Sequence, residues 1–186
     1  PTASERLRHH EWPIDFERYR APKNDWKRNL RETLGDGYEV ILLDMPNKIN
    51  AKYVEWQIWF EKFLPYLEEK VVLIGHSMGG SFLVKYLSEN KFPKKIKGLF
   101  LIASPFKSDA EYPLASFALP ADLSRLAAQS EKIFLYHSQD DPVVPFAELE
   151  KYRKNLPNAI VRIFPDHGHF NQEELPEIIQ DIKLTF

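Results

Sequence analysis

The segment Gly75-His76-Ser77-Met78-Gly79 contains the pattern Gly-x-Ser-x-Gly. An apolar run at 70–75 precedes the serine, and an amphipathic run at 78–89 follows it. A strand, a tight turn and a helix in this order form a nucleophile elbow, in which the turn lifts the serine hydroxyl above the sheet. The pattern therefore predicts that Ser77 is a nucleophile in acyl transfer.

The same turn predicts how a developing negative charge would be held. A helix that starts directly after Ser77 places the Met78 amide, and the positive end of the helix dipole, beside a substrate oxygen. Glycine is expected on both sides of the serine because Cβ atoms at Gly75 and Gly79 would collide with neighbouring backbone. The alternative interpretation is an ordinary glycine-rich turn between a strand and a helix.

A serine hydroxyl is a weak nucleophile and needs a base, usually a histidine that a carboxylate orients. Asp140 and Asp141 follow the apolar run at 132–138, and His167 and His169 follow the run at 159–164. Each pair stands just after the carboxyl end of a predicted strand, on the same rim as the serine. Position alone does not decide whether Asp140 or Asp141 is the acid, or whether His167 or His169 is the base.

A metal site is a second interpretation of the histidine-rich segment. Asp166, His167 and His169 lie together in the sequence, but no further pair of ligands accompanies them. The polar cluster His9-His10-Glu11 stands alone in a predicted N-terminal arm. We therefore expect neither a metal nor an organic cofactor.

The elements that must position these residues alternate along the chain. Short runs rich in Val, Ile, Leu and Phe predict strands at 38–43, 70–75, 97–103, 132–138 and 159–164. Helical patterns lie around them at 24–34, 51–68, 78–89, 121–129, 146–155 and 172–183. This alternation is typical of βαβ units and predicts an α/β three-layer sandwich with a mainly parallel sheet of five or more strands.

The 186 residues are the length of one domain, so we expect a single domain over 1–186. Residues 1–23 do not fit the alternation and are expected to form a surface arm or a short helix. Residues 104–120 hold three prolines and show no clear period, which predicts a short lid-like loop. Phe106, Tyr112 and Phe117 in this loop either line a substrate pocket or pack the loop down.

Composition excludes several classes of protein. The chain has 25 Lys and Arg against 27 Asp and Glu, whereas a nucleic-acid binder carries a basic excess. It has no apolar run long enough to cross a bilayer, so no integral membrane segment is expected. The absence of cysteine excludes disulfides, thiolate zinc sites and cysteine nucleophiles, and fits a cytoplasmic location. The polar first residues predict no secretory signal, although a targeting segment upstream of Pro1 stays open.

Taken together, the motifs resemble those of α/β-hydrolases, and more narrowly of the small serine hydrolases grouped with retinoblastoma-binding protein 9. The matching segments lie at 42–47, 74–80, 138–146 and 168–171. The resemblance implies little or no cap domain and the chain order Ser, Asp, His.

The resemblance also separates the paired candidates. It implies that Asp141, directly before a proline, is the acid and that His169 is the base. Asp140 is then expected to accept backbone amides, and His167 to be a solvated loop residue. His76 is expected to flank the nucleophile without acting as a base, and it is a candidate for substrate binding.

One feature departs from the family. The family's second oxyanion donor comes from a loop after a first strand, near a His-Gly pair, and no such strand or pair precedes the helix at 24–34. The chain's His-Gly pair, His167-Gly168, lies instead in the segment 165–173 around His169, which we call the base loop. We expect that an N-terminal segment is left out of this chain; alternatively, residues 1–23 supply the role. The source of that donor stays open.

These observations predict a serine hydrolase that cleaves small carboxylic esters through an acyl-enzyme on Ser77. Thioester, amide and acyl-transfer reactions use the same three residues and are not distinguished by sequence. The alternative function is a catalytically weak or idle hydrolase-fold protein with a binding or regulatory role. Retinoblastoma binding through an L-x-C-x-E motif is excluded, because the chain has no cysteine.

Overall fold

A parallel sheet of four strands forms the centre of the computed structural model, which describes residues 25–106 and 114–186. The strands lie in the order β1 (Lys70–His76), β2 (Lys95–Ile102), β3 (Ile133–Ser138) and β4 (Ile160–Phe164). Four of the five predicted strands are thereby confirmed. The arm predicted at 1–23, and Tyr112 of the predicted lid, lie outside the described residues.

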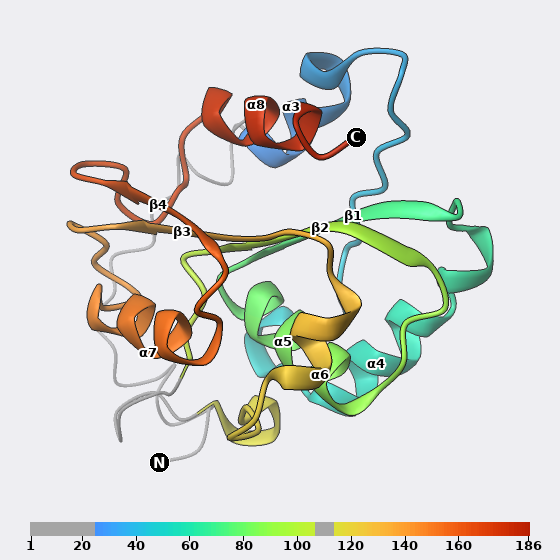
Figure 1. Ribbon diagram of the computed structural model, residues 1–186, viewed down its shortest axis with the longest axis horizontal. Coiled ribbons are helices and arrows are strands. Elements are labelled where there is room, and N and C mark those ends of the chain that lie inside the picture. The colour runs from blue at the N-terminus through green and yellow to red at the C-terminus, as the bar shows by residue number, and fades with distance from the viewer. Residues whose placement is uncertain (1–24, 107–113) are drawn as a thin grey trace.

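Helices cover both faces of this sheet (Figure 1). One face carries α3 (Trp26–Leu34) and α8 (Pro176–Lys183). The other carries α4 (Tyr53–Glu61), α5 (Met78–Glu89), α6 (Ser124–Gln129) and α7 (Ala147–Asn155). Single 3-10 turns lie at Lys48–Asn50, Leu64–Tyr66 and Ala115–Phe117. The predicted three-layer α/β sandwich is confirmed.

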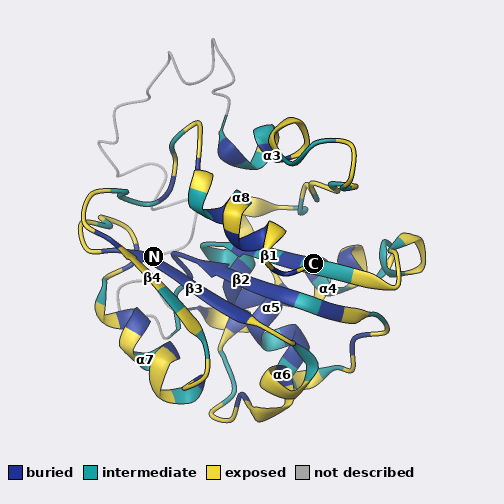
Figure 2. Cartoon of the chain, turned by 45° about the horizontal axis from the view of Figure 1, so that its top comes forward, coloured by how far each residue is buried: buried dark blue, intermediate teal, exposed yellow. Residues whose placement is uncertain are grey.

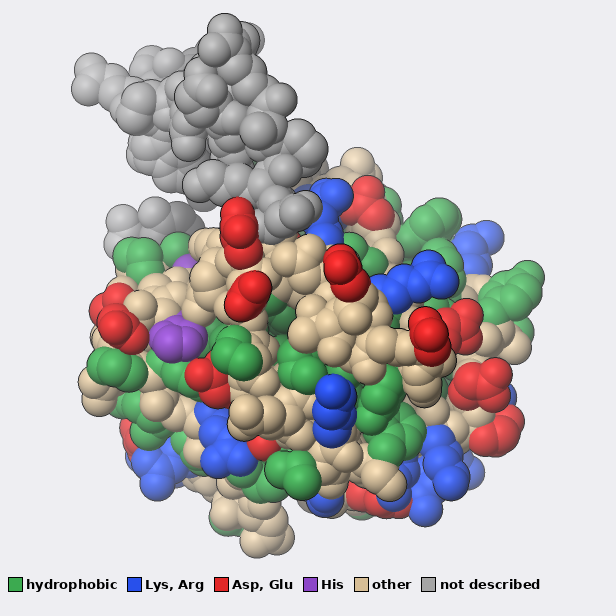
Figure 3. Space-filling view, turned by 90° about the horizontal axis from the view of Figure 1, so that it is seen from above, with side chains coloured by type: hydrophobic (Ala, Val, Ile, Leu, Met, Phe, Trp, Pro, Cys, Tyr) green, Lys and Arg blue, Asp and Glu red, His purple; other side chains and the backbone are tan. Residues whose placement is uncertain are grey.

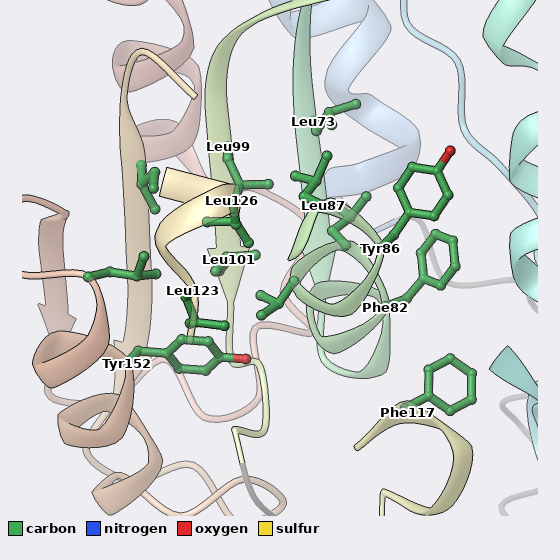
Figure 4. Packing of buried hydrophobic residues seen from close by; sticks show 14 of the residues in the cluster. Leu73, Phe82, Tyr86, Leu87, Leu99, Leu101, Phe117, Leu123, Leu126 and Tyr152 are labelled. Atoms are coloured by element: carbon green, nitrogen blue, oxygen red, sulfur yellow. The ribbon is translucent and has the colours of Figure 1, made fainter. Parts of the chain in front are cut away.

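Alternation along the strands divides the core between the two faces, because successive side chains of a strand point to opposite sides. Leu99 and Leu101 of β2 belong to the cluster formed with α4 to α7, and Figure 4 shows them among side chains of those helices. Phe100 and Ile102 belong to the cluster formed with α3 and α8. The two central strands, β2 and β3, are consequently mostly buried, whereas the edge strand β4 and the outer sides of the helices are largely exposed (Figure 2).

The segment 38–43 is not a strand, and its prediction was wrong. Val40 packs against the cluster of α3 and α8, whereas Leu43 packs against the opposite cluster. Ile41 and Leu42 are exposed, and among the described residues the segment pairs with no strand. Strand-like composition is not sufficient where no neighbour completes a ladder of hydrogen bonds.

An ion pair between the exposed Arg162 and the buried Asp181 ties β4 to α8. Asp181 accepts hydrogen bonds from Arg162 Nε at 2.9 Å and Nη2 at 2.8 Å, and from the Tyr136 hydroxyl at 2.6 Å. Burial alone would raise the pKa of Asp181, but the hydrogen bonds from Arg162 and Tyr136 outweigh it and lower the pKa. The helix α8, which follows His169 in the chain, is thus anchored to both β3 and β4.

The outer face over α3 and α8 carries charges of both signs. Figure 3 shows Lys and Arg side chains interspersed there with Asp and Glu rather than gathered into a basic stripe. Lys27, for example, lies 3.1 Å from the Asp25 carboxylate. This described face therefore lacks the concentrated positive charge that a phosphate backbone requires.

Candidate active site

Three loops meet at the carboxyl edge of the sheet. Ser77 directly follows β1, Asp140 and Asp141 follow β3, and His169 comes after β4. Because all four strands run parallel, these loops emerge at the same edge. The sequence prediction that the three loops share one rim is correct.

The elbow at Ser77 has the strained backbone that its motif predicts. Ser77 has φ 54° and ψ −127°, in a positive-φ region that L-residues rarely adopt. Its amide donates to the Ile102 carbonyl at 2.8 Å, which fixes the turn to the end of β2. The conformation directs the serine side chain away from the helix that begins after it.

Glycine is required at Gly75 and Gly80, and the expectation for Gly79 was wrong. A Cβ at Gly75 would lie 2.5 Å from the Gly80 Cα, and one at Gly80 would lie 1.7 Å from Ser104 Oγ. A Cβ built on Gly79 meets no atom within 4 Å beyond its chain neighbours and the backbone of its own helix. The close approach of β1 and α5 therefore depends on Gly80 rather than Gly79, because Gly80 faces Ser104 just after the end of β2.

The Met78 amide lies at the start of α5, a helix of 12 residues. The first amides of a helix have no acceptor within the helix. They also carry the positive end of the helix dipole. The Met78 N–H is therefore available to an oxygen that develops negative charge beside Ser77.

Asp141 is held as an oriented carboxylate. Its Oδ1 accepts the amides of Val143 at 2.8 Å and Val144 at 3.0 Å, and its Oδ2 lies 2.9 Å from His169 Nδ1. The Asp141 side chain is fully buried. Burial would raise its pKa, but the hydrogen bonds from His169 and the two amides outweigh it, so the pKa of Asp141 is lowered.

Asp140 has a different environment from its neighbour. Its Oδ1 accepts the Ser138 hydroxyl and, at 2.8 Å, the Gly168 amide. The Ser138 hydrogen bond, followed by that of Gly168, lowers the pKa of Asp140. The side chain accepts a backbone amide, as predicted, and ties the acid loop to the base loop.

His169 sits between two residues with left-handed backbone, Gly168 with φ 51° and Phe170 with φ 52°. A carboxylate can only accept, so the contact with Asp141 places the proton of a neutral His169 on Nδ1 and leaves the Nε2 lone pair free. Ser77 Oγ makes no hydrogen bond to His169 in the described structure. Such contacts are often long before substrate binds.

His167 does not reach the acid. Its ring packs on Phe164 with centroids 4.3 Å apart, and its Nδ1 lies 3.4 Å from the neighbouring Asp166 carboxylate. Its amide donates to Ser138 Oγ at 2.9 Å. The residue is half-buried in the loop rather than freely solvated as expected, and the structure pairs His169 alone with Asp141.

His76 contacts the base loop instead of pointing away from it. Its Nε2 lies 2.8 Å from the His169 carbonyl oxygen, and the two rings are 4.8 Å apart between centroids. Burial is the main cause that lowers the pKa of His76 to about 4. His76 is therefore neutral at pH 7, and its Nε2 donates to the carbonyl.

Comparison with known proteins shows the family of the chain. Residues 16–178 match the family described as serine hydrolase. The chain belongs to the serine hydrolase family. Serine hydrolase RBBP9 of Rattus norvegicus is 27% identical over 161 residues, which cover 85% of this chain and 83% of that protein.

Further relatives agree with this assignment to the serine hydrolase family. The YdeN protein of Bacillus subtilis (strain 168) is 25% identical over 180 residues, which cover 90% of this chain and 92% of that protein. The crystal structure of the B. subtilis ydeN gene product aligns with a TM-score of 0.75 at 21% identity, over 83% of this chain and 86% of that one. An Arabidopsis thaliana protein named as a methylesterase is 32% identical over 90 residues, 48% of this chain and 25% of that protein. The fold is that of the α/β-hydrolases.

The aromatic residues of the predicted lid have separate positions in this serine hydrolase. Phe117 is buried in the core, with its ring 5.0 Å from Trp56 and 5.9 Å from Tyr53, so the packing interpretation holds for it (Figure 4). Phe106 is half-buried, and its ring meets Tyr152 edge-on at 4.9 Å. Tyr112 lies outside the described residues.

The sequence did not predict the contacts that Trp26 makes at the loop of His169. The indole of Trp26 donates to the Phe170 carbonyl at 2.9 Å, and its ring meets His76 edge-on at 6.3 Å. A tryptophan at the start of an amphipathic helix indicates only that the helix packs on a core, so no sequence signal pointed to this contact.

No helix in 25–106 or 114–186 is long and apolar enough to cross a membrane. Within the same ranges, no group of three or more His, Cys, Asp or Glu side chains lies close enough to hold a metal ion.

Proposed function

We propose that this protein hydrolyses small carboxylic esters through an acyl-enzyme on Ser77. The observation that carries the proposal is the contact of Asp141 with His169 Nδ1 at 2.9 Å, on the rim where the elbow presents Ser77. A nucleophile, a base and an orienting acid on three separate loops are the parts that acyl transfer from serine needs.

Each of the three residues has a defined role in the proposed reaction. His169 Nε2 takes the proton of Ser77 Oγ as the oxygen attacks the ester carbonyl. The Asp141 carboxylate keeps the proton on Nδ1 and stabilises the imidazolium that forms. His169 then gives its proton to the departing alcohol, and later activates the water that releases the acid from Ser77.

The oxyanion of each tetrahedral intermediate lies beside the first turn of α5 in this proposal. The Met78 N–H is the donor, and the helix dipole favours the charge. The family's second donor would come from chain before α3, and residues 1–24 lie outside the described structure. Losing one such donor costs on the order of 10²–10³ in turnover, so activity depends strongly on that segment.

Esters are the preferred substrates in this proposal because an alkoxide leaves more readily than an amide nitrogen. The relative named as a methylesterase supports the same class. Of the two described aromatic residues in 104–120, Phe117 is buried in the core and Phe106 is half-buried. We infer small acyl groups, because a loop of this length offers little material for a long acyl tunnel. No cofactor takes part.

The test combines labelling with turnover. Wild-type protein, Ser77→Ala and the matched control Ser88→Ala are treated with a fluorophosphonate probe, and the adduct is mapped by peptide mass. Ser88 lies on α5, and its hydroxyl is bound to the Val84 carbonyl at 2.8 Å. Hydrolysis of p-nitrophenyl acetate, butyrate and octanoate is measured on the same three proteins.

We expect one adduct, on Ser77, that persists in Ser88→Ala and is lost in Ser77→Ala. We also expect kcat/KM to fall from acetate to octanoate. Folded wild-type protein without an adduct, or ester hydrolysis that survives in Ser77→Ala, would refute the proposal. Labelling of Ser77 without turnover of any ester would refute the substrate class and keep the nucleophile.

A further inference from the structure

The loop that carries His169 does not hold its shape by local preference. Phe170 has φ 52°, a left-handed conformation that is strained for a non-glycine residue. Such strain persists only where surrounding contacts determine the backbone. Phe170 is fully buried, with its ring edge-on to Phe164 at 5.4 Å, but this contact fixes a side chain after the base and not the base itself.

The backbone of this loop is instead bound by donors from two other elements. Four of its carbonyl oxygens, those of residues 169, 170, 172 and 173, accept hydrogen bonds from α3 or from the end of β1. Trp26 donates twice, from its indole to residue 170 at 2.9 Å and from its amide to residue 172 at 3.1 Å. Asn29 Nδ2 donates to residue 173 at 3.0 Å.

His76 makes the contact that matters most for geometry. It is covalently next to Ser77, and its Nε2 donates to the carbonyl of His169 itself at 2.8 Å. The side chain of His76 therefore links the elbow at Ser77 directly to the backbone of His169. The rings of Trp26 and His76 also meet in a T-shaped contact, with centroids 6.3 Å apart. The first turn of α3 thus supports both the loop and the side chain that links the loop to the elbow.

We propose that His76 and Trp26 are positioning residues that hold His169 at the correct separation from Ser77. This inference rests on the proposed function, since it assigns both residues a role in that same reaction. Neither residue touches the reacting atoms in this scheme. Their effect is on how often His169 Nε2 lies within reach of the serine hydroxyl, so it is expressed in the rate of proton transfer rather than in substrate affinity.

The experiment removes the side-chain N–H donors of Trp26 and His76 and leaves an aromatic ring at each position. Trp26→Phe lacks the indole N–H, and His76→Phe lacks the Nε2 donor. His76→Gln is the conservative variant, because its side-chain amide can donate from nearly the same place. Trp59→Phe is the matched control, since Trp59 lies on α4, is 39% exposed and packs on Phe63. All assays are run well below the lowest melting temperature in the set.

We expect kcat for p-nitrophenyl acetate to fall about five- to tenfold in Trp26→Phe and in His76→Phe, as the loss of one hydrogen bond allows, with KM unchanged. His76→Gln should recover most of the loss, and Trp59→Phe should match wild type. The rate of fluorophosphonate labelling should follow kcat in every variant. The downfield proton resonance of His169 Nδ1 should broaden in the two impaired proteins.

Two outcomes separate this inference from the function on which it rests. If folded wild-type protein neither labels nor turns over, the proposed function fails. If wild type is active and both ring-preserving variants keep its kcat and its His169 resonance, the positioning role fails while the function stands. A loss that His76→Gln does not recover, or that appears only as a lower melting temperature, would also overturn the positioning role.

Discussion

Replacing Asp141 by asparagine separates the orientation of the base from the rest of the site. Oδ1 of Asp141 accepts two backbone amides, from Val143 and Val144, and Oδ2 faces His169 Nδ1. In Asp141→Asn the amide oxygen must stay with the two backbone donors, because the opposite orientation would leave two amides facing an NH₂ group. The NH₂ group therefore takes the place of Oδ2, the oxygen nearer to Nδ1 at 2.9 Å against 3.1 Å for Oδ1, and the imidazole can accept it only by moving its own proton to Nε2.

That change of tautomer removes the lone pair that would take the serine proton. Loss of the correct tautomer costs on the order of 10⁴ in turnover, or about 5 kcal/mol of barrier. We expect kcat/KM for p-nitrophenyl acetate, and the rate of fluorophosphonate labelling, to fall by this factor in Asp141→Asn. Urea unfolding checks that the variant is folded.

Asp140→Asn is the matched control, because an amide oxygen can accept the hydrogen bonds that Asp140 Oδ1 accepts from Ser138 and Gly168. We expect it to keep activity within about tenfold of wild type. The reasoning fails if folded Asp141→Asn retains more than about a tenth of wild-type activity. It also fails if Asp140→Asn loses as much as Asp141→Asn.

Three further predictions concern stability. Gly80→Ala should lower the free energy of unfolding by about 2–3 kcal/mol, because its Cβ would lie 1.7 Å from Ser104 Oγ. Gly79→Ala should change the free energy of unfolding by less than about 1 kcal/mol. Urea titrations compare the two variants, and equal losses of stability would contradict the packing described for Gly80. Asp181→Asn should lower the free energy of unfolding by about 2 kcal/mol at pH 7. The difference from wild type should shrink as pH falls below about 4, because the folded-state pKa of Asp181 is lowered. A difference in stability that grows in acid would refute this expectation. The folded-state pKa of His76, about 4, lies below the unfolded value of about 6.5. As pH falls from about 6.5 to about 4, the free energy of unfolding of wild type should therefore decrease by up to about 3 kcal/mol relative to that of His76→Gln. The same pH dependence of stability in both proteins would contradict this prediction.

Local patterns predicted the parts of the site that depend on local structure. The helix over 78–89 begins and ends where its periodicity placed it, and four apolar runs are strands. The loops after β1, β3 and β4 follow from the parallel order of the strands, so their meeting at one edge needed no knowledge of side-chain contacts. The pairing of Asp141 rather than Asp140 with His169 could be inferred from resemblance, since neighbouring aspartates have the same local signal.

Features that depend on distant contacts could not be predicted in this way. The run at 38–43 has a strand's composition, but whether it pairs depends on what lies beside it. The need for glycine fell on Gly80 rather than Gly79, because Ser104, on another loop, occupies the space. His76 and Trp26 meet the base loop through contacts that the order of residues along the chain does not reveal.

The hydrogen bonds that α3 makes to the base loop also bear on when the site is completed during folding. Trp26 and Phe170 are 144 residues apart, as are Asn29 and Glu173. Contacts of such separation form slowly, because the entropy of closing a long loop is lost before the contact is gained. On the ribosome α3 and the Ser77 elbow are made long before residues 169–173 emerge. We therefore expect a nascent chain to form the Ser77 turn before His169 is in place, so that the proposed site would be completed late in folding.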